Sequence, residues 1–222
     1  MSEVVFLTIK LALLTTLSLV VLATPLAWWL ARTRSWLKIP LSALVTLPIV
    51  LPPTVLGFYI LVLLAPDGWI GVWTHQYGFG PRAFSFSGLL FGSIIYSLPF
   101  AVQPLQNSFQ AMGTRPLEVA ATLGLNPWRR FFKVALPLAK PGYISAMVLV
   151  FAHTLGEFGV ILMIGGNIPG RTKVISTAIY DYVEMLQYDK AHLLAAGLLL
   201  FSFVIMVSLY TFQRRNERPW TR

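Results

Sequence analysis

The chain has 222 residues, of which 56% are hydrophobic and only 11% are charged, and its mean hydropathy is +0.71. This composition excludes an ordinary soluble domain and predicts an integral membrane protein. The lack of cysteine excludes a disulfide framework and a thiolate metal site. The net charge of +9 does not indicate nucleic-acid binding, because the cations are divided among three loops and form no continuous patch.

Five segments are long and apolar enough to cross a hydrocarbon core of about 30 Å, which requires roughly 20 helical residues. They cover about residues 6–31, 41–65, 88–110, 142–163 and 191–212. We therefore predict an all-α integral membrane protein with five transmembrane helices in one domain, residues 1–222. The first segment has no cationic start ahead of it, so we expect a retained span and not a signal peptide.

Twelve lysine and arginine residues follow the first, third and fifth segments. They are Arg32, Arg34, Lys38, Arg115, Arg129, Arg130, Lys133, Lys140, Arg214, Arg215, Arg218 and Arg222. The remaining five are Lys10, Arg82, Arg171, Lys173 and Lys190. By the positive-inside rule, this asymmetry predicts an outside N-terminus, an inside C-terminus and a cytoplasmic loop at residues 111–140.

The second segment carries three prolines within six residues, Pro48, Pro52 and Pro53. Each removes a backbone donor and clashes with the preceding turn, so the helix should break or kink strongly. A break at membrane depth persists only where protein or a wet cavity satisfies the freed carbonyls. Pro52, Pro53 and Thr54 are therefore candidates for a hinge or a transport pathway, and a static kink is the alternative.

The third segment bears a stripe of polar side chains, Ser93, Tyr96, Ser97, Gln103, Asn107 and Gln110. Such a stripe either faces an aqueous path or bonds neighbouring helices. Ser93 and Ser97 are pathway candidates. Because no Lys or Arg lies inside segments two to five, an anionic cargo would meet dipoles and hydroxyls without a strong countercharge.

The loop at 111–140 predicts two short helices. Pro116 and Glu118 suit a first helical turn, and Gly124 followed by Asn126-Pro127 suits a stop. The apolar positions of the first helix, spaced to share one face, are Leu117, Ala120, Ala121 and Gly124. They predict a narrow ridge that fits a groove on another protein, although an ordinary connector is the alternative. In the second helix, Trp128, Phe131, Phe132 and Ala135 share a face that suits the headgroup boundary.

The fourth segment contains His153, Gly156, Glu157 and Gly159. A carboxylate inside the bilayer costs roughly 3 kcal/mol unless it faces protein or water. His153 is one turn earlier on the same face, and the two glycines permit close packing or a local break. We expect a structural contact at an outer gate; the alternative is a helix end at which Glu157 reaches water. One His and one Glu do not make a metal site.

Beyond this segment, the polar turn at 167–172 precedes apolar residues at helical spacing, Ile175, Ile179, Tyr182, Val183 and Leu186. This pattern predicts a lateral helix on the outer surface, which either receives a solute-binding protein or roofs a channel. The chain has no G-x-x-x-x-G-K-[ST] loop, so any ATP chemistry belongs to a partner. An intramembrane hydrolase using His153 as base is a weaker hypothesis, because no G-x-S-x-G elbow is present. A purely structural subunit would not need the ridge.

The run Glu118-Val119-Ala120-Ala121-Thr122-Leu123-Gly124, followed after nine residues by Val134-Ala135-Leu136-Pro137, resembles the "EAA" loop of bacterial ABC importer permeases, with Val119 in place of the first alanine. Together with Leu47–Gly57, Leu155–Gly159 and Asn167–Thr172, it makes the chain similar to molybdate ABC transporter permeases over nearly its whole length. The proline-rich segment Leu47–Gly57 and the segment Leu155–Gly159 also resemble those of sulfate and tungstate permeases.

The resemblance implies a type I ABC importer permease fold in the cytoplasmic (inner) membrane of a bacterium. It implies a homodimer, two ATPase subunits, an extracytoplasmic molybdate-binding protein and surrounding lipid as partners. The ATPase-coupling residues would be Leu117, Glu118, Ala120, Ala121, Gly124, Leu136 and Pro137. The chain itself would be no enzyme and would bind no cofactor or metal, since the partner uses the ATP. Molybdate is the expected cargo, and tungstate or sulfate/thiosulfate is the alternative.

Overall fold

The computed structural model describes residues 2–77 and 82–216, and every regular element in these ranges is helical. The helices are α1 (Ser2–Arg32), α2 (Lys38–Val50), α3 (Pro53–Leu64), α4 (Trp69–Gln76), α5 (Phe86–Met112), α6 (Arg115–Thr122), α7 (Pro127–Arg130), the π-helical turn η1 (Phe131–Ala135), α8 (Leu136–Leu138), α9 (Lys140–Gly156), α10 (Gly159–Gly165), α11 (Ile175–Glu184) and α12 (Tyr188–Asn216). The predicted all-α class is confirmed. Arg218 and Arg222 lie outside the described residues.

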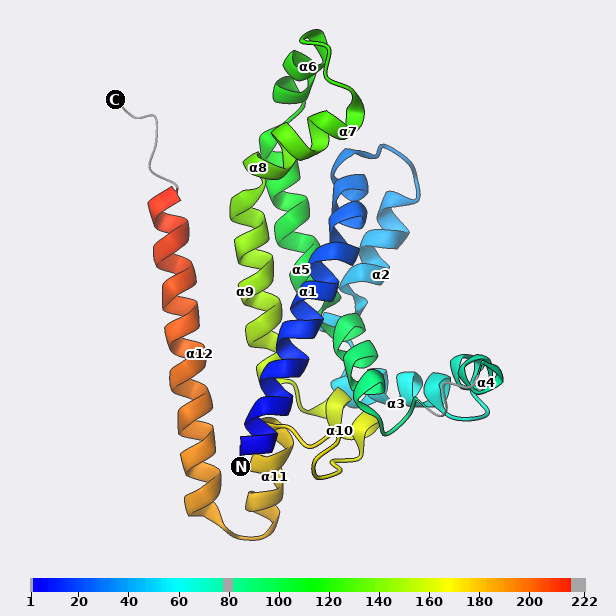
Figure 1. Ribbon diagram of the computed structural model, residues 1–222, viewed down its shortest axis with the longest axis vertical. Helices are drawn as coiled ribbons and strands as arrows, with labels where there is room; N and C mark the ends of the chain where they lie inside the picture. The colour runs from blue at the N-terminus through cyan, green and yellow to red at the C-terminus, as the bar shows by residue number, and fades with distance from the viewer. Residues whose placement is uncertain (1, 78–81, 217–222) are drawn as a thin grey trace.

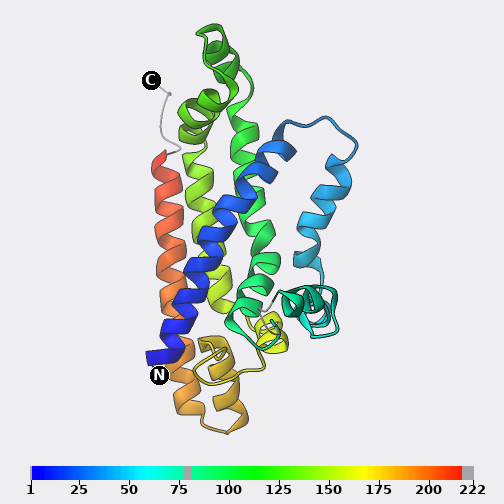
Figure 2. The same ribbon diagram turned by 45° about the vertical axis from the view of Figure 1, so that its right-hand side comes forward.

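Helices α1, α5 and α9 pack on one another and form the core of the molecule (Figures 1 and 2). Alanines on all three are fully buried, among them Ala23, Ala101 and Ala146, and such small side chains let helix backbones approach closely. Gly142 of α9 serves the same purpose against Ser108 of α5. An edge-on aromatic contact between Trp28 and Phe109, with ring centroids 5.0 Å apart, fills one end of this core.

The second apolar segment is interrupted where the prolines predict a break. Helix α2 ends at Val50, Leu51 and Pro52 have extended backbone conformations, and α3 begins at Pro53. Figures 1 and 2 show that α3 and α4 extend across the long axis of the bundle instead of continuing α2. The segment expected at 41–65 is thus divided, as its prolines predict, because Pro52 and Pro53 cannot complete the hydrogen bonds of one helix.

The segment expected at 142–163 is divided too. Helix α9 ends at Gly156, Glu157 is extended, and α10 begins at Gly159. Gly159 is needed at the new start, because a Cβ there would lie 2.8 Å from the Cβ of Pro53. Gly159 therefore lets α10 pack closely against α3, and Glu157 lies at the break between α9 and α10.

By length and composition, four segments of the described residues qualify as membrane spans: Ser2–Arg32, Pro53–Thr74, Phe86–Met112 and Tyr188–Gln213. A fifth is added if Pro127–Leu138 and Lys140–Gly156, bent by 68° relative to each other, count as one span. Helices α6 to α8 lie at the end of the bundle where α1 and α12 finish, and α10 and α11 lie at the opposite end (Figure 1).

Candidate functional site

The breaks in the second and fourth segments border one cavity of about 550 Å³, here named the Glu157 cavity. Its lining residues are Pro53, Thr54, Tyr96, Ala152, His153, Gly156, Glu157, Phe158 and Gly159. Six of the predicted gate residues therefore meet there: Pro53, Thr54, His153, Gly156, Glu157 and Gly159. Pro52 lies directly before α3, and Ser93 and Ser97 are buried on α5 and do not line the cavity.

Glu157 is the least satisfied polar side chain of this cavity. It is 3% exposed, and no hydrogen bond to either carboxylate oxygen has regular geometry, although the buried Ser93 hydroxyl of α5 lies close enough to interact with it. Its main-chain oxygen accepts a hydrogen bond from the Ser176 hydroxyl, which links the break to α11. The alternative reading of Glu157 as a helix end in open water does not hold, because the side chain is enclosed by protein.

His153 contacts α5 through both its ring nitrogen and its ring face. Its Nδ1 lies 3.0 Å from the Ser97 hydroxyl, and its ring stacks on Phe100 with centroids 4.1 Å apart. Ser97 also lies 3.3 Å from the Thr154 hydroxyl and is fully buried. A serine and a histidine at this distance resemble a hydrolase pair, but a fully buried Ser97 offers no room for a substrate. The pair ties α5 to α9.

Further along α5, polar side chains surround a second cavity of about 550 Å³, named the Gln103 cavity. Gln103, Asn107, Ser145 and Gln213 line it, and the Gln213 amide donates to the Ser145 hydroxyl at 2.9 Å. Gln103 and Asn107 also line a neighbouring cavity of about 330 Å³ beside α2. The polar stripe of the third segment thus serves both expected uses: Ser97 bonds a neighbouring helix, while Gln103 and Asn107 face open space.

Phe100 lies between the Glu157 cavity and the Gln103 cavity. Its ring lines the Gln103 cavity and stacks on His153, which lines the Glu157 cavity. The sequence reasoning missed Phe100, Ser145 and Gln213. An aromatic residue inside an apolar helix carries no signal of its own, and its importance emerges only when α5 and α9 are placed side by side.

Helix α6 presents only part of the ridge that the sequence predicts, since Ala121 and Gly124 are exposed but Leu117 and Ala120 are buried. Leu117 and Ala120 are only 4% and 5% exposed, because α6 folds back onto α7 and η1. Val119 and Leu123, spaced one turn apart, are instead the exposed apolar side chains, at 59% and 74%. The predicted face must therefore be corrected to the side that carries Val119 and Leu123.

The remaining coupling candidates lie in two separate places, at α6 and in α8. Glu118, Ala121 and Gly124 are exposed on α6 or at its end. Gly124 has φ +80°, a left-handed conformation that favours glycine and that ends the helix as predicted. Leu136 and Pro137 lie away from α6, in α8 beside the bend that leads into α9.

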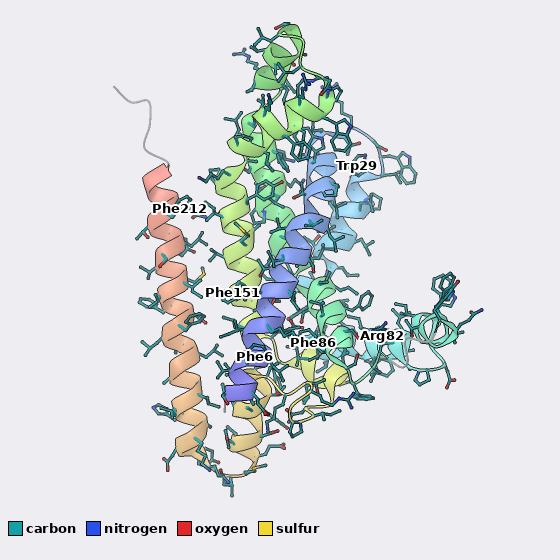
Figure 3. The ribbon with its side chains drawn as sticks, viewed as in Figure 1. Phe6, Trp29, Arg82, Phe86, Phe151 and Phe212 are labelled. Carbon is teal, nitrogen blue, oxygen red and sulfur yellow. The ribbon has the colours of Figure 1, made fainter. Side chains whose placement is uncertain are left out.

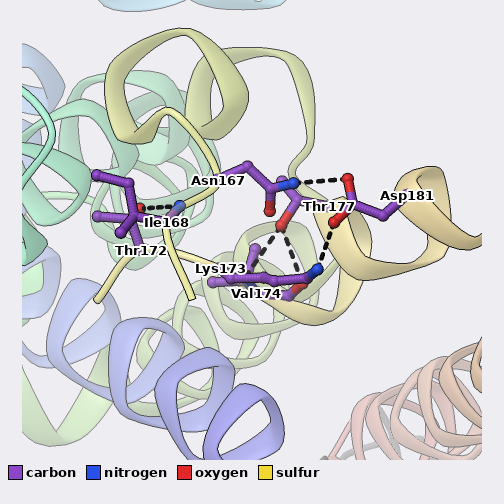
Figure 4. A network of polar contacts seen from close by, with 7 residues as sticks. All are labelled: Asn167, Ile168, Thr172, Lys173, Val174, Thr177 and Asp181. Carbon is purple, nitrogen blue, oxygen red and sulfur yellow. Dashed lines mark hydrogen bonds and ion pairs between the residues drawn. The ribbon is translucent and has the colours of Figure 1, made fainter. Parts of the chain in front are cut away.

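At the opposite end of the bundle, a polar network holds the turn before α11 (Figure 4). Asp181 accepts a hydrogen bond of 2.6 Å from the Asn167 amide and forms an ion pair with Lys173. The Thr172 hydroxyl accepts from the Ile168 amide and donates to the Gly165 carbonyl. On the outer side of α11, Glu184 accepts a hydrogen bond from Tyr180 and raises the pKa of that hydroxyl. The predicted polar turn and lateral helix are present.

A helical bundle with two broken segments, internal cavities and an exposed short helix at one end is the architecture of a membrane transport subunit. The family model described as "Binding-protein-dependent transport system inner membrane component" matches residues 23–222. The chain belongs to this family and is a multi-pass inner-membrane protein.

Curated relatives agree with this assignment. The chain is 58% identical over 208 residues to the "Molybdenum transport system permease protein ModB" of Azotobacter vinelandii, covering 94% of this chain and 92% of the relative. It is 32% identical over 193 residues to the "Sulfate transport system permease protein CysT" of Escherichia coli K12, covering 87% of this chain and 69% of that relative.

Solved structures share the fold at low identity. A bacterial ABC transporter that imports the polysaccharide alginate superposes with a TM-score of 0.76 at 19% identity, covering 97% of this chain and 79% of that one. The methionine ABC transporter MetNI, in an inward-facing conformation, superposes with a TM-score of 0.73 at 17% identity. The match covers 98% of this chain and 96% of that one. The fold is thus that of ABC importer transmembrane subunits.

Proposed function

We propose that this chain is the permease subunit of an ATP-driven importer that carries molybdate across the inner membrane into the cell. The observation that carries the cargo assignment is the 58% identity to a molybdenum permease over 94% of the chain. A sulfate permease is 32% identical and the chain covers 69% of its length. Tungstate, sulfate and thiosulfate therefore remain the alternative cargoes.

The assembly would contain two copies of this chain, two ATPase subunits and an external molybdate-binding protein. ATP would be bound and hydrolysed by the ATPases, while this chain binds no cofactor. The end that carries α6 would face the cytoplasm, with the N-terminus outside. This orientation is supported by three cations, because Arg32 ends α1, Arg130 lies in α7 and Lys140 begins α9. The end of α1, α7 and the start of α9 lie at the α6 end of the bundle together with the last turns of α12 (Figure 1).

Coupling would use the exposed side of α6. Val119 and Leu123 offer an apolar contact, and Ala121 is small enough to allow a close approach. Because Leu117 and Ala120 are buried against α7 and η1, a force on α6 would be transmitted to α8 and then, through the bend at Ala139, to α9. Helix α9 ends at Gly156, directly before Glu157, so α9 connects the segment that carries α6 to the Glu157 cavity.

The gate would lie at the Phe100–His153 stack. An ion that moved directly between the Glu157 cavity and the Gln103 cavity would pass this pair, and the two rings would then separate during transport. Neutral amides and hydroxyls in the Gln103 cavity would hold an oxyanion weakly, as a conduit requires for release.

The test is uptake by vesicles that contain this chain, the partner ATPase and the binding protein. Labelled molybdate should accumulate only with ATP inside the reconstituted system, and excess tungstate and sulfate should compete in that order. Sulfate that enters as fast as molybdate would transfer the assignment to a sulfate permease. Uptake without the ATPase would refute an ABC importer.

A variant of α6 tests the coupling surface. Leu123→Asp should weaken association with the ATPase about tenfold in a pull-down titration, because losing one hot-spot side chain costs more than about 1 kcal/mol. Leu186→Asp is the matched control, since Leu186 is 72% exposed but follows α11 at the other end of the bundle. Equal binding by both variants would place the ATPase contact elsewhere.

A further inference from the structure

A fourth cavity, of about 560 Å³, opens between the last turns of α1 and the α7–η1 segment. Its walls include Trp28 and Arg32 from α1 and Trp128, Arg130 and Phe131 from α7 and η1. We name it the Arg130 cavity. The proposed transport pathway uses none of these side chains, and they lie away from the exposed side of α6.

Two guanidinium groups border this cavity without a carboxylate. Arg32 lies over the Trp28 ring, with its Cζ 4.5 Å from the ring centroid. The Nε of Arg130 is buried and has no hydrogen-bond partner among the described residues. No Asp or Glu lines the cavity, and within the described ranges the ion pair found is Lys173–Asp181, at the opposite end of the bundle. A buried guanidinium nitrogen with no partner is costly, so this site favours an anion.

The position of the cavity relative to the membrane indicates the source of that anion. The apolar run of α1 ends at Arg32, so this residue marks one boundary of the hydrocarbon region. At the rim, Trp128 and Phe132 stack with ring centroids 6.1 Å apart and are 74% and 55% exposed. Exposed aromatic side chains beside arginines are typical of the headgroup level of a bilayer.

We propose that the Arg130 cavity binds one anionic phospholipid. Its phosphate would lie between the guanidiniums of Arg32 and Arg130, which supply paired donors on opposite walls. Its acyl chain would follow the apolar wall formed by Trp28 and Phe131. The charge complementarity selects an anionic headgroup over a zwitterionic one, and the apolar wall selects a lipid over free phosphate.

Such a lipid would connect the end of α1 to the segment that carries α6. Trp28 and Phe131 are already in edge-on contact, with centroids 5.1 Å apart, so the bound lipid would extend an existing contact. The proposal does not depend on the cargo, and it holds whichever face of the membrane this end occupies.

Native mass spectrometry of the full chain tests the site. The chain is equilibrated in mixed micelles with phosphatidylglycerol or with phosphatidylcholine, and the retained lipid is counted. We expect one phosphatidylglycerol per chain, little phosphatidylcholine, and an about fivefold loss of retention in Arg32→Gln and in Arg130→Gln. Arg129→Gln is the matched control, because it removes the same charge from the neighbouring, exposed position and should retain the lipid.

Three results would overturn the proposal. Equal loss in Arg129→Gln would mean diffuse attraction without a site. Equal retention of phosphatidylcholine would leave the cavity to a protein partner or to bulk lipid. Displacement by inorganic phosphate at the same concentration as the lipid would show a free-anion site.

Tryptophan quenching gives a second measurement in case Arg130→Gln folds poorly. Brominated phosphatidylglycerol should quench the fluorescence contributed by Trp128, taken as the difference from Trp128→Phe, more strongly than brominated phosphatidylcholine does. The preference should disappear in Arg32→Gln, whose exposed side chain is not part of the core. An unchanged preference in Arg32→Gln would also overturn the proposal.

Discussion

Helices α5 and α12 are both long, yet the more apolar of the two is the less buried. Over its most apolar window α12 has a mean hydropathy of 2.4 and is 6% buried, whereas α5 has 1.4 and is 50% buried. Figure 3 shows side chains that project from α12 into open space along most of its length. Since lipid tails are as apolar as leucine, hydrophobicity alone does not draw a helix into the interior of a membrane protein.

What fixes α5 in the core is small and polar side chains. Gly92 approaches Ile164, Ser97 bonds His153, and Ala101 is fully buried. Helix α12 packs mainly against α9 and α11, where Phe201 and Phe151 meet with ring centroids 6.4 Å apart. The comparison implies that stability depends on close contacts around α5, while α12 is free to contact lipid or a second copy.

The strongest test of the difference between the α5 core and α12 replaces one glycine in each with leucine, Gly142 at the α5–α9 contact and Gly197 in α12. A Cβ at Gly142 of α9 would lie 2.4 Å from Ser108 Cβ and 2.8 Å from the Pro104 carbonyl oxygen of α5. Because that backbone cannot move aside unless the helices separate, Gly142→Leu should destabilise by about 3 kcal/mol or more. Thermal unfolding followed by tryptophan fluorescence measures the change.

Gly197→Leu is the control, because a Cβ at Gly197 meets no atom within 4 Å. We expect its unfolding temperature to match the wild type. If Gly142→Leu left the temperature unchanged, the close α5–α9 contact would be wrong. A drop in Gly197→Leu that depends on protein concentration would show that α12 packs against a second copy.

A smaller effect, of opposite sign on stability, is expected at Glu157. Removing its two unpaired, buried oxygens in Glu157→Leu should raise stability by about 1–3 kcal/mol, since an unsatisfied buried polar group carries a desolvation cost of that size. The same variant should reduce uptake or cause a leak, because it changes the wall of the Glu157 cavity.

Glu157→Gln separates shape from charge. If it transports like the wild type while Glu157→Leu does not, a hydrogen-bonding side chain suffices at the gate. Loss of folding in Glu157→Leu would instead show that the carboxyl is a structural contact, with the Ser93 hydroxyl as the candidate partner.

Local signals in the sequence predicted the helices and their breaks well. Pro52 and Pro53 ended α2, and Gly124 ended α6, because backbone chemistry at these positions does not depend on distant contacts. Pro53, His153 and Glu157 were separate candidates in the sequence, and only the packing of α10 against α3 shows that they border one cavity.

Features that depend on contacts between separate helices could not be predicted from the sequence. Which face of α6 is exposed is decided by α7 and η1, which cover Leu117 and leave Leu123 free. A periodicity reports that a face is apolar but not which neighbour covers it. For the same reason, Phe100 and Arg130 gained a role only when α9 and α1 were placed beside them.

The smallest predicted effect concerns the support of α12. Its first turns pack against α11, and α11 is held to the preceding turn by the ion pair and hydrogen bond that Asp181 makes with Lys173 and Asn167 (Figure 4). Because both partners are partly exposed, Asp181→Asn should cost about 1 kcal/mol or less, and less still in 1 M salt.

Hydrogen exchange measures this loss of stability in Asp181→Asn as a difference between α12 and α5. Amides in the first turns of α12 should exchange faster in Asp181→Asn, while those of α5 stay protected, because few contacts hold α12 and many hold α5. Asp67→Asn, at an exposed position between α3 and α4, should change neither helix. Faster exchange in α5 would mean that α12 and the core unfold as one unit, and the distinction between a fixed core and a weakly attached helix would fail.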